Sequence, residues 1–120
     1  MIEDEKDIRE SLAEAIESEG YSTLTAPNGM DAILMFEDEA RIPEKMPDLI
    51  LLDLLMPRMN GATFLERARR NKRLAKIPVV LMTTDREAAQ KATKYGAAGH
   101  LHKPLGLDEL YSTIEKYCLH

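Results

Sequence analysis

The sequence predicts an α/β domain in which a parallel sheet is covered by helices on both faces. Two continuous apolar runs, 49–52 and 78–82, are typical of strands that are buried on both sides. Helical patterns with a period of 3.6 residues lie between and around these runs, and they are long enough to form crossover connections. A repeated β-α order with helical crossovers favours a three-layer, doubly wound architecture.

Length, charge and cysteine content narrow the class of protein. The chain has 120 residues, enough for one domain over residues 1–120. Its formal net charge of −5 argues against a nucleic-acid surface. Cys118 is the only cysteine, so no internal disulfide can form, which fits a reducing compartment. No apolar run approaches the roughly 18 residues of a membrane span and no signal peptide opens the chain, so we expect a cytoplasmic protein without a membrane partner.

The first half of the chain shows three elements before the buried run at 49–52. Apolar positions with helical spacing predict a helix over 5–19 that stops at Gly20. Residues 21–26 are expected to form a short strand. Asn28 is expected to cap a helix that runs to about residue 40.

The second half continues the alternation. Residues 62–71 are predicted to be helical, and Thr84 with Glu87 has the spacing of a capping box for a helix over 85–95. A short strand is expected over 99–102. A final helix is marked by apolar residues at helical spacing: Leu110, Ile114, Tyr117 and Cys118.

The strand that should precede the first helix is almost missing. Only Met1 and Ile2 stand before the acidic residues that lead into that helix, and they look like the tail of a strand. The beginning of this strand is missing, so we expect that the true start lies upstream; the alternative is that another chain lends a strand.

Polar residues follow the predicted strands, where open parallel sheets bind ligands. In strand order these residues are Glu3 and Asp4, then Asp53, then Thr83 and Thr84, then Lys103. Clustered carboxylates repel each other, and a hard cation such as Mg²⁺ removes that repulsion. A carboxylate nucleophile, a metal, an ammonium group and a hydroxyl together suit phosphoryl transfer.

Each of these residues has a simpler reading when taken alone. Asp4 could cap the first helix, and Glu3 could be a solvated charge. Asp53 could be a turn residue, Thr83 could serve strand packing, and Lys103 could face solvent. Only their joint placement at consecutive strand ends favours a site.

These motifs resemble the receiver domain of bacterial two-component response regulators, the class typified by chemotaxis regulators. The matching segments are Glu3-Asp4-Glu5, 47–53, 56–61, 78–83, Gly96-Ala97 and His102-Lys103-Pro104. The resemblance spans nearly the whole chain. It implies a flavodoxin-like, five-stranded parallel sheet of order 2-1-3-4-5, here with its first strand truncated.

The resemblance also implies roles for the site residues. Asp53 would be the phosphoacceptor, and Lys103, joined to Pro104 by a cis bond, would pair with the phosphoryl group. Asp53 would also share in holding Mg²⁺ with the acidic pair Glu3 and Asp4, of which Asp4 would be the direct ligand. The backbone carbonyl of Leu55 would be another ligand. Thr83 would be the switch hydroxyl.

The implied partners are a sensor histidine kinase or phosphotransfer protein, and a downstream protein or fused output domain. At position 100 the family often places an aromatic switch residue, whereas this chain has His100, which adds a group that titrates near neutral pH. His100 and His102 share a strand face, but no third ligand for a metal is evident.

Two alternatives to a phosphorylated switch remain open. A pseudo-receiver would keep the fold as an interaction module without phosphorylation, and the short first strand and His100 give this reading some support. The intact Asp53, Thr83 and Lys103 argue against it. A hydrolase or a flavin protein is remote, because no glycine-rich phosphate loop is present. Beyond its self-catalysed phosphoryl transfer and hydrolysis at Asp53, the domain is not expected to be an enzyme.

Overall fold

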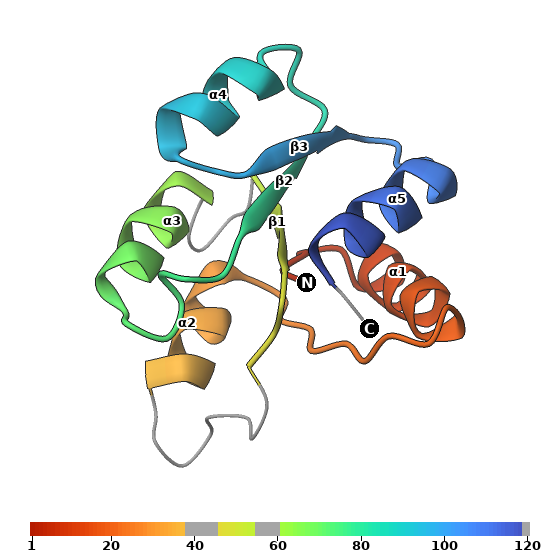
Figure 1. The fold of residues 1–120 in the computed structure, drawn as a ribbon, viewed down its shortest axis with the longest axis horizontal. Helices are drawn as coiled ribbons and strands as arrows, with labels where there is room; N and C mark the ends of the chain where they lie inside the picture. Colours follow the sequence, from red (N-terminus) through yellow and green to blue (C-terminus); the bar gives the residue numbers. More distant parts are fainter. Residues whose placement is uncertain (38–45, 55–60, 119–120) are drawn as a thin grey trace.

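The computed structural model describes residues 1–37, 46–54 and 61–118. It shows a parallel sheet with helices on both sides (Figure 1). In chain order the elements are α1 (Lys6–Ser18), α2 (Gly29–Glu37), β1 (Ile50–Asp53), α3 (Gly61–Arg70), β2 (Val79–Thr83), α4 (Ala88–Tyr95), β3 (Gly99–His102) and α5 (Leu107–Tyr117). The predicted α/β class and layer arrangement are confirmed.

The regular part of the sheet has the order β1-β2-β3, with all pairs parallel. Every residue of β1 and β2 is buried, as the continuous apolar runs predict. β3 lies at the edge and is only partly buried. Because all three strands run the same way, their carboxyl ends, Asp53, Thr83 and His102, meet at one edge of the sheet.

Helices cover both faces of the sheet (Figure 1), and an apolar layer on each face holds them to it. On one face, α1 and α5 contribute Leu12, Ile16, Leu110 and Ile114, which pack against Leu51, Val80 and Met82. On the other face, α2, α3 and α4 contribute Ile33, Phe36, Phe64 and Ala92, which pack against Ile50, Leu52 and Leu81. Full burial of one such large side chain stabilises the fold by about 1.5–3 kcal/mol.

The first strand is reduced to a single residue. Ile2 forms parallel bridges to Ala26 on one side and to Leu52 on the other. The spatial order is therefore Ala26, Ile2, β1, β2, β3, which keeps the expected 2-1-3-4-5 order. The prediction of a strand over 21–26 is wrong, because only Ala26 has a neighbour with which to pair.

Two predictions about helix starts have different outcomes. Asn28 caps α2 as expected, since its Oδ1 accepts the Asp31 N–H at 2.8 Å; the predicted end near residue 40 lies outside the described residues. The capping box of Thr84 and Glu87 is wrong. No side chain caps α4, which begins at Ala88 after a turn stabilised by Asp85, whose Oδ1 accepts the Glu87 N–H at 2.8 Å.

The remaining predicted elements are confirmed with small changes at their ends. The strand over 99–102 matches β3, and the helices predicted over 5–19 and 62–71 match α1 and α3. The Lys103–Pro104 bond is cis, as expected. None of the helices in the described ranges has the length and apolar character needed to cross a membrane.

Candidate functional site

Polar side chains are buried at the carboxyl edge of the sheet, in an otherwise apolar interior. Glu3 follows Ile2, and its exposed fraction is 0%. Asp53 ends β1 and Thr83 ends β2, with exposed fractions of 5% and 1%. Asp4 lies beside them but is exposed. Charged groups are rarely buried unless they are paired, so this cluster needs a physical reason.

Lys103 supplies the pairing. Its Nζ lies 2.8 Å from Glu3 Oε2 and 3.0 Å from Asp53 Oδ2. One ammonium group therefore joins two buried carboxylates that are far apart in the sequence. The structure brings together the three residues expected from their strand ends.

Backbone hydrogen bonds fix these residues in place. The Lys103 N–H donates to the Thr83 carbonyl at 2.9 Å, which extends the β2–β3 pairing by one residue. The Glu3 N–H donates to the Ala26 carbonyl at 3.1 Å. Arg9 of α1 donates to the Glu3 carbonyl at 2.9 Å, a contact that the sequence analysis missed. Its signal is only that Arg9 stands in the first turn after the acidic residues.

The site's electrostatics favour a further cation. Burial raises the pKa of Asp53 to about 6, against the lowering effect of Lys103, while Glu3 and Asp4 add to the rise. Burial alone would lower the pKa of Lys103, but its hydrogen bonds to Glu3 and Asp53 raise it overall. The single Lys103 ammonium thus only partly offsets the free-energy cost of burying these charged carboxylates.

The donor set fits a hard divalent cation. Glu3, Asp4 and Asp53 each offer an oxygen, and these oxygens lie within 4.8 Å of one another. It is the one such cluster of three or more possible ligands among the residues that the structure describes. Carboxylate oxygens, some of them exposed to water, are what Mg²⁺ takes in proteins. The expected fourth ligand, the Leu55 carbonyl, lies outside the described residues.

Among the described residues, the side chains of Thr83 and His100, the two expected switch residues, form no hydrogen bond to the Lys103 ammonium or to the carboxylates, and each has another partner. The Thr83 Oγ1 accepts the Asp85 N–H at 3.0 Å, in the turn that leads to α4. The ring of His100 stands edge-to-face against that of His102, with centroids 5.5 Å apart. Within the described ranges, this histidine pair belongs to no group of three possible metal ligands.

The chain matches the family model of the response regulator receiver domain over residues 1–115. The protein belongs to this family. Receiver domains are signalling domains rather than enzymes in the usual sense, and they use Mg²⁺ at an acidic pocket. This receiver domain is accordingly a phosphorylation-activated signalling switch.

Several relatives resemble the receiver domain over nearly its whole length. It is 29% identical to sporulation initiation phosphotransferase F of Bacillus subtilis, covering 98% of this chain and 90% of that protein. It is 33% identical to the regulatory protein AtoC of Escherichia coli, covering 97% of this chain but only 24% of AtoC. The structure of chemotaxis protein CheY4 of Vibrio cholerae superposes with a TM-score of 0.83 at 26% identity, covering 97% and 93% of the two chains.

Proposed function

We propose that Asp53 of this receiver domain accepts a phosphoryl group, with Lys103, Thr83 and a bound Mg²⁺ assisting. The observation that supports this assignment is the Lys103 ammonium, which lies within 3.0 Å of oxygens on both Glu3 and Asp53. A surface lysine or a simple turn aspartate would not need such a buried arrangement. The same contacts favour an active receiver over a pseudo-receiver.

The transfer needs a nucleophile and charge neutralisation but no separate base. An Asp53 carboxylate oxygen attacks the phosphorus of a kinase's phosphohistidine or of a small acyl phosphate. The new O–P bond forms as the P–N or P–O bond of the donor breaks. The donor's leaving atom keeps the electron pair: an imidazole nitrogen then takes up a proton, whereas the carboxylate of an acyl phosphate leaves as the anion. Lys103 stays beside the phosphoryl oxygens and offsets their charge. Water later hydrolyses the phosphoryl group from Asp53, which releases inorganic phosphate and restores the carboxylate.

The residues that would hold Mg²⁺ are Glu3, Asp4 and Asp53, with the Leu55 carbonyl as a further ligand. When bound, the ion neutralises charge on the phosphoryl oxygens. Asp4 is the exposed member of this set, so it suits direct contact with an ion that keeps several waters. Glu3 is fully buried and already paired with Lys103, which suits a supporting position.

The signal would pass from Asp53 through Thr83 and His100 to a downstream partner. A sensor histidine kinase or a phosphotransfer protein would supply the phosphoryl group. Because the chain spans 90% of one relative and 24% of another, both a separate downstream protein and a fused output domain suit this reading.

Replacing Asp53 with asparagine tests the assignment directly. Asp53→Asn keeps the shape of the side chain but removes the nucleophile. Intact mass after incubation with an acyl phosphate and Mg²⁺ should show one phosphoryl adduct on the native chain and none on Asp53→Asn. Chelation of Mg²⁺ should strongly reduce adduct formation on the native chain.

The control variant is Asp48→Asn, which alters an exposed carboxyl group just before the same strand. It should gain the adduct as the native chain does. An adduct retained on Asp53→Asn, or an adduct lost from Asp48→Asn, would contradict the assignment of the phosphoacceptor.

A further inference from the structure

The turn between β2 and α4 is organised by Asp85, which stands two residues after Thr83. Its N–H donates to Thr83 Oγ1 at 3.0 Å, and its Oδ1 accepts the Glu87 N–H at 2.8 Å. Its other carboxylate oxygen, Oδ2, accepts a hydrogen bond from the ammonium group of Lys91 in α4. Asp85 therefore connects the hydroxyl oxygen of Thr83 to a charged side chain of the helix.

The Asp85–Lys91 ion pair is more protected from water than a pair on an open helix surface. The exposed fractions of the Lys91 and Asp85 side chains are 32% and 23%, whereas those of Lys6 and Glu10 in α1 are 74% and 64%. The hydrogen bond from Lys91 lowers the pKa of Asp85, and the same bond raises the pKa of Lys91. Each charge thus stabilises the other, and loss of the Lys91 charge should release the Asp85 side chain.

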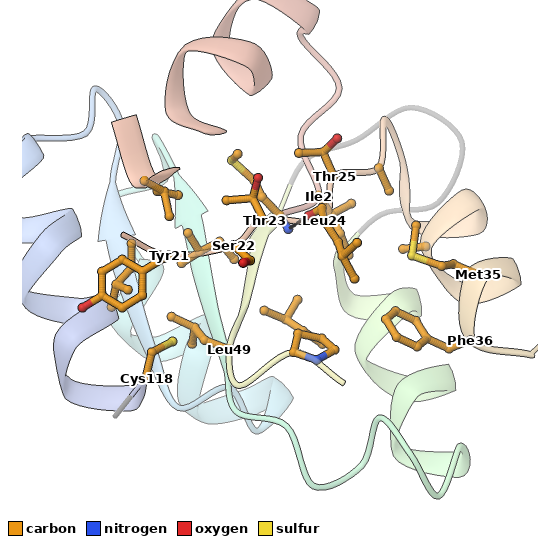
Figure 2. A pocket seen from close by; sticks show the side chains of 18 of the residues that line it. Ile2, Tyr21, Ser22, Thr23, Leu24, Thr25, Met35, Phe36, Leu49 and Cys118 are labelled. Atoms are coloured by element: carbon orange, nitrogen blue, oxygen red, sulfur yellow. Dashed lines mark hydrogen bonds between the residues drawn. The ribbon is translucent and has the colours of Figure 1, made fainter. Parts of the chain in front are cut away.

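Few large apolar side chains fix α4 to the sheet. The buried residues of this helix are Ala88 and Ala92, and small side chains bury little apolar area. The helix α2, by contrast, packs with larger side chains, of which Figure 2 shows Met35 and Phe36 beside a cavity of about 130 Å³. The polar contacts of Asp85 therefore contribute a larger share of what positions the start of α4.

Thr83 can change its hydrogen bonds only by turning its side chain. Its backbone is held in the sheet, where its carbonyl accepts the Lys103 N–H at 2.9 Å. A movement of the hydroxyl toward new oxygens on Asp53 requires rotation about the Cα–Cβ bond, which takes Oγ1 away from the Asp85 N–H. How firmly Asp85 is held therefore sets how readily Thr83 can turn.

We propose that Asp85 and Lys91 are positioning residues for Thr83, and that their ion pair favours the arrangement in which Thr83 Oγ1 accepts the Asp85 N–H. This role rests on the proposed phosphorylation of Asp53. A phosphoryl group there has to draw the Thr83 hydroxyl away from a turn that Lys91 holds in place. The ion pair thus lowers the population of the shifted arrangement in the free protein, and a ligand that requires this arrangement binds less tightly.

An ion pair that served only the stability of α4 would behave differently. Removal of the Lys91 charge would then lower the free energy of unfolding but leave the affinity for a phosphoryl mimic at Asp53 unchanged. Under the proposal, the same change raises that affinity, and the rise depends on the Thr83 hydroxyl. Affinity for a mimic therefore separates a positioning role from a structural one.

The test measures by NMR titration how tightly the full 120-residue chain binds beryllium fluoride, a phosphoryl mimic, in the presence of Mg²⁺. Lys91→Met removes the charge but keeps a long side chain of good helix propensity. It should bind the mimic about three- to tenfold more tightly than the native chain, because the hydrogen bond that holds Thr83 toward Asp85 is weakened. Lys91→Arg keeps the charge and should bind as the native chain does. Lys94→Met, which removes a cation lying over the Tyr95 ring, should also match the native chain.

Thr83→Val decides whether the effect of Lys91 passes through Thr83. In that background Lys91→Met should not change the affinity, because no hydroxyl oxygen remains for the Asp85 N–H to hold. An affinity of Lys91→Met equal to that of the native chain, or a gain that persists in Thr83→Val, would overturn the role of Lys91. Beryllium fluoride that binds Asp53→Asn as tightly as the native chain would instead contradict the assignment of Asp53 as the phosphoacceptor.

Discussion

Asp53 lies between two opposite effects at the end of β1. Its burial disfavours the ionised carboxylate, while the Lys103 ammonium 3.0 Å away favours it. The balance leaves the pKa of Asp53 raised to about 6. The proposed role of Asp53 as a nucleophile requires the ionised carboxylate, which burial makes costly to the folded state.

That cost predicts how stability depends on pH in the metal-free chain. Because the folded pKa is above the unfolded one, the folded state binds the Asp53 proton more tightly, and stability falls as pH rises from about 4 to about 6. Asp53→Asn lacks this charge, so it should be more stable than the native chain by about 1–3 kcal/mol at pH 7.5. The gap should shrink toward pH 4.5.

Urea unfolding in a chelating buffer at the two pH values measures this gap. Asp48→Asn, with its exposed carboxyl group, should show little change at either pH. A gap for Asp53→Asn that is constant with pH, or that grows toward pH 4.5, would contradict the raised pKa.

At the scale of elements, the end of α4 is stabilised by a neighbouring helix. Gly96 ends α4 in the left-handed conformation, with φ of 75°. Arg69 of α3 donates to the Tyr95 carbonyl there, and its guanidinium occupies the space that a side chain at position 96 would need. Gly20 ends α1 with φ of 91° but has open space around it.

This contrast predicts unequal effects of alanine at the two glycines. Gly20→Ala should cost roughly 1 kcal/mol for the backbone conformation alone. Gly96→Ala should cost more, by roughly 0.5–1.5 kcal/mol, because the methyl group displaces Arg69 from the Tyr95 carbonyl. In an Arg69→Ala background this excess should vanish. Urea unfolding of the native chain, Arg69→Ala and each glycine variant in both backgrounds gives the coupling free energy, and an unchanged excess would mean that Arg69 has no part in it.

Local patterns predicted the elements that depend on burial, and they failed where tertiary partners decide. Continuous apolar runs located β1 and β2, because strands that are buried on both faces consist mainly of apolar residues. The strand over 21–26 failed because its partner is a single residue, Ile2. The capping box at Thr84 failed because other side chains accept the backbone N–H groups of this turn. Thr83 Oγ1 accepts the Asp85 N–H, and Asp85 Oδ1 accepts the Glu87 N–H.

The sequence predicts where the site residues lie, but not which of their side chains bond to one another. The ends of the predicted strands place Glu3, Asp53 and Lys103 at one edge of the sheet. That one ammonium would bond to both carboxylates depends on side-chain reach across the sheet, which no local pattern encodes.

At the scale of the whole molecule, Thr83 links the edge of the sheet that holds Asp53, the proposed phosphoacceptor, to α4. Its Oγ1 accepts the Asp85 N–H in the turn before the helix, and its carbonyl accepts the Lys103 N–H. A phosphoryl group on Asp53 adds about −1.5 to −2 charges and new acceptor oxygens. If the Thr83 hydroxyl turns to donate to them, the turn at Asp85 has to adjust, and α4 and β3 follow.

Thr83→Val isolates this link, because valine keeps the branched shape and the burial but has no oxygen. The native chain with a phosphate mimic on Asp53 should show NMR shifts at Asp85, along α4 and at His100. Thr83→Val should still take up the mimic, with shifts at Asp53 and Lys103, while those along α4 become small. The free native chain should already sample the shifted state as a minor population, since a ligand can only favour states that differ in affinity for it. Shifts along α4 and at His100 that persist in Thr83→Val would show that the signal leaves Asp53 by another route.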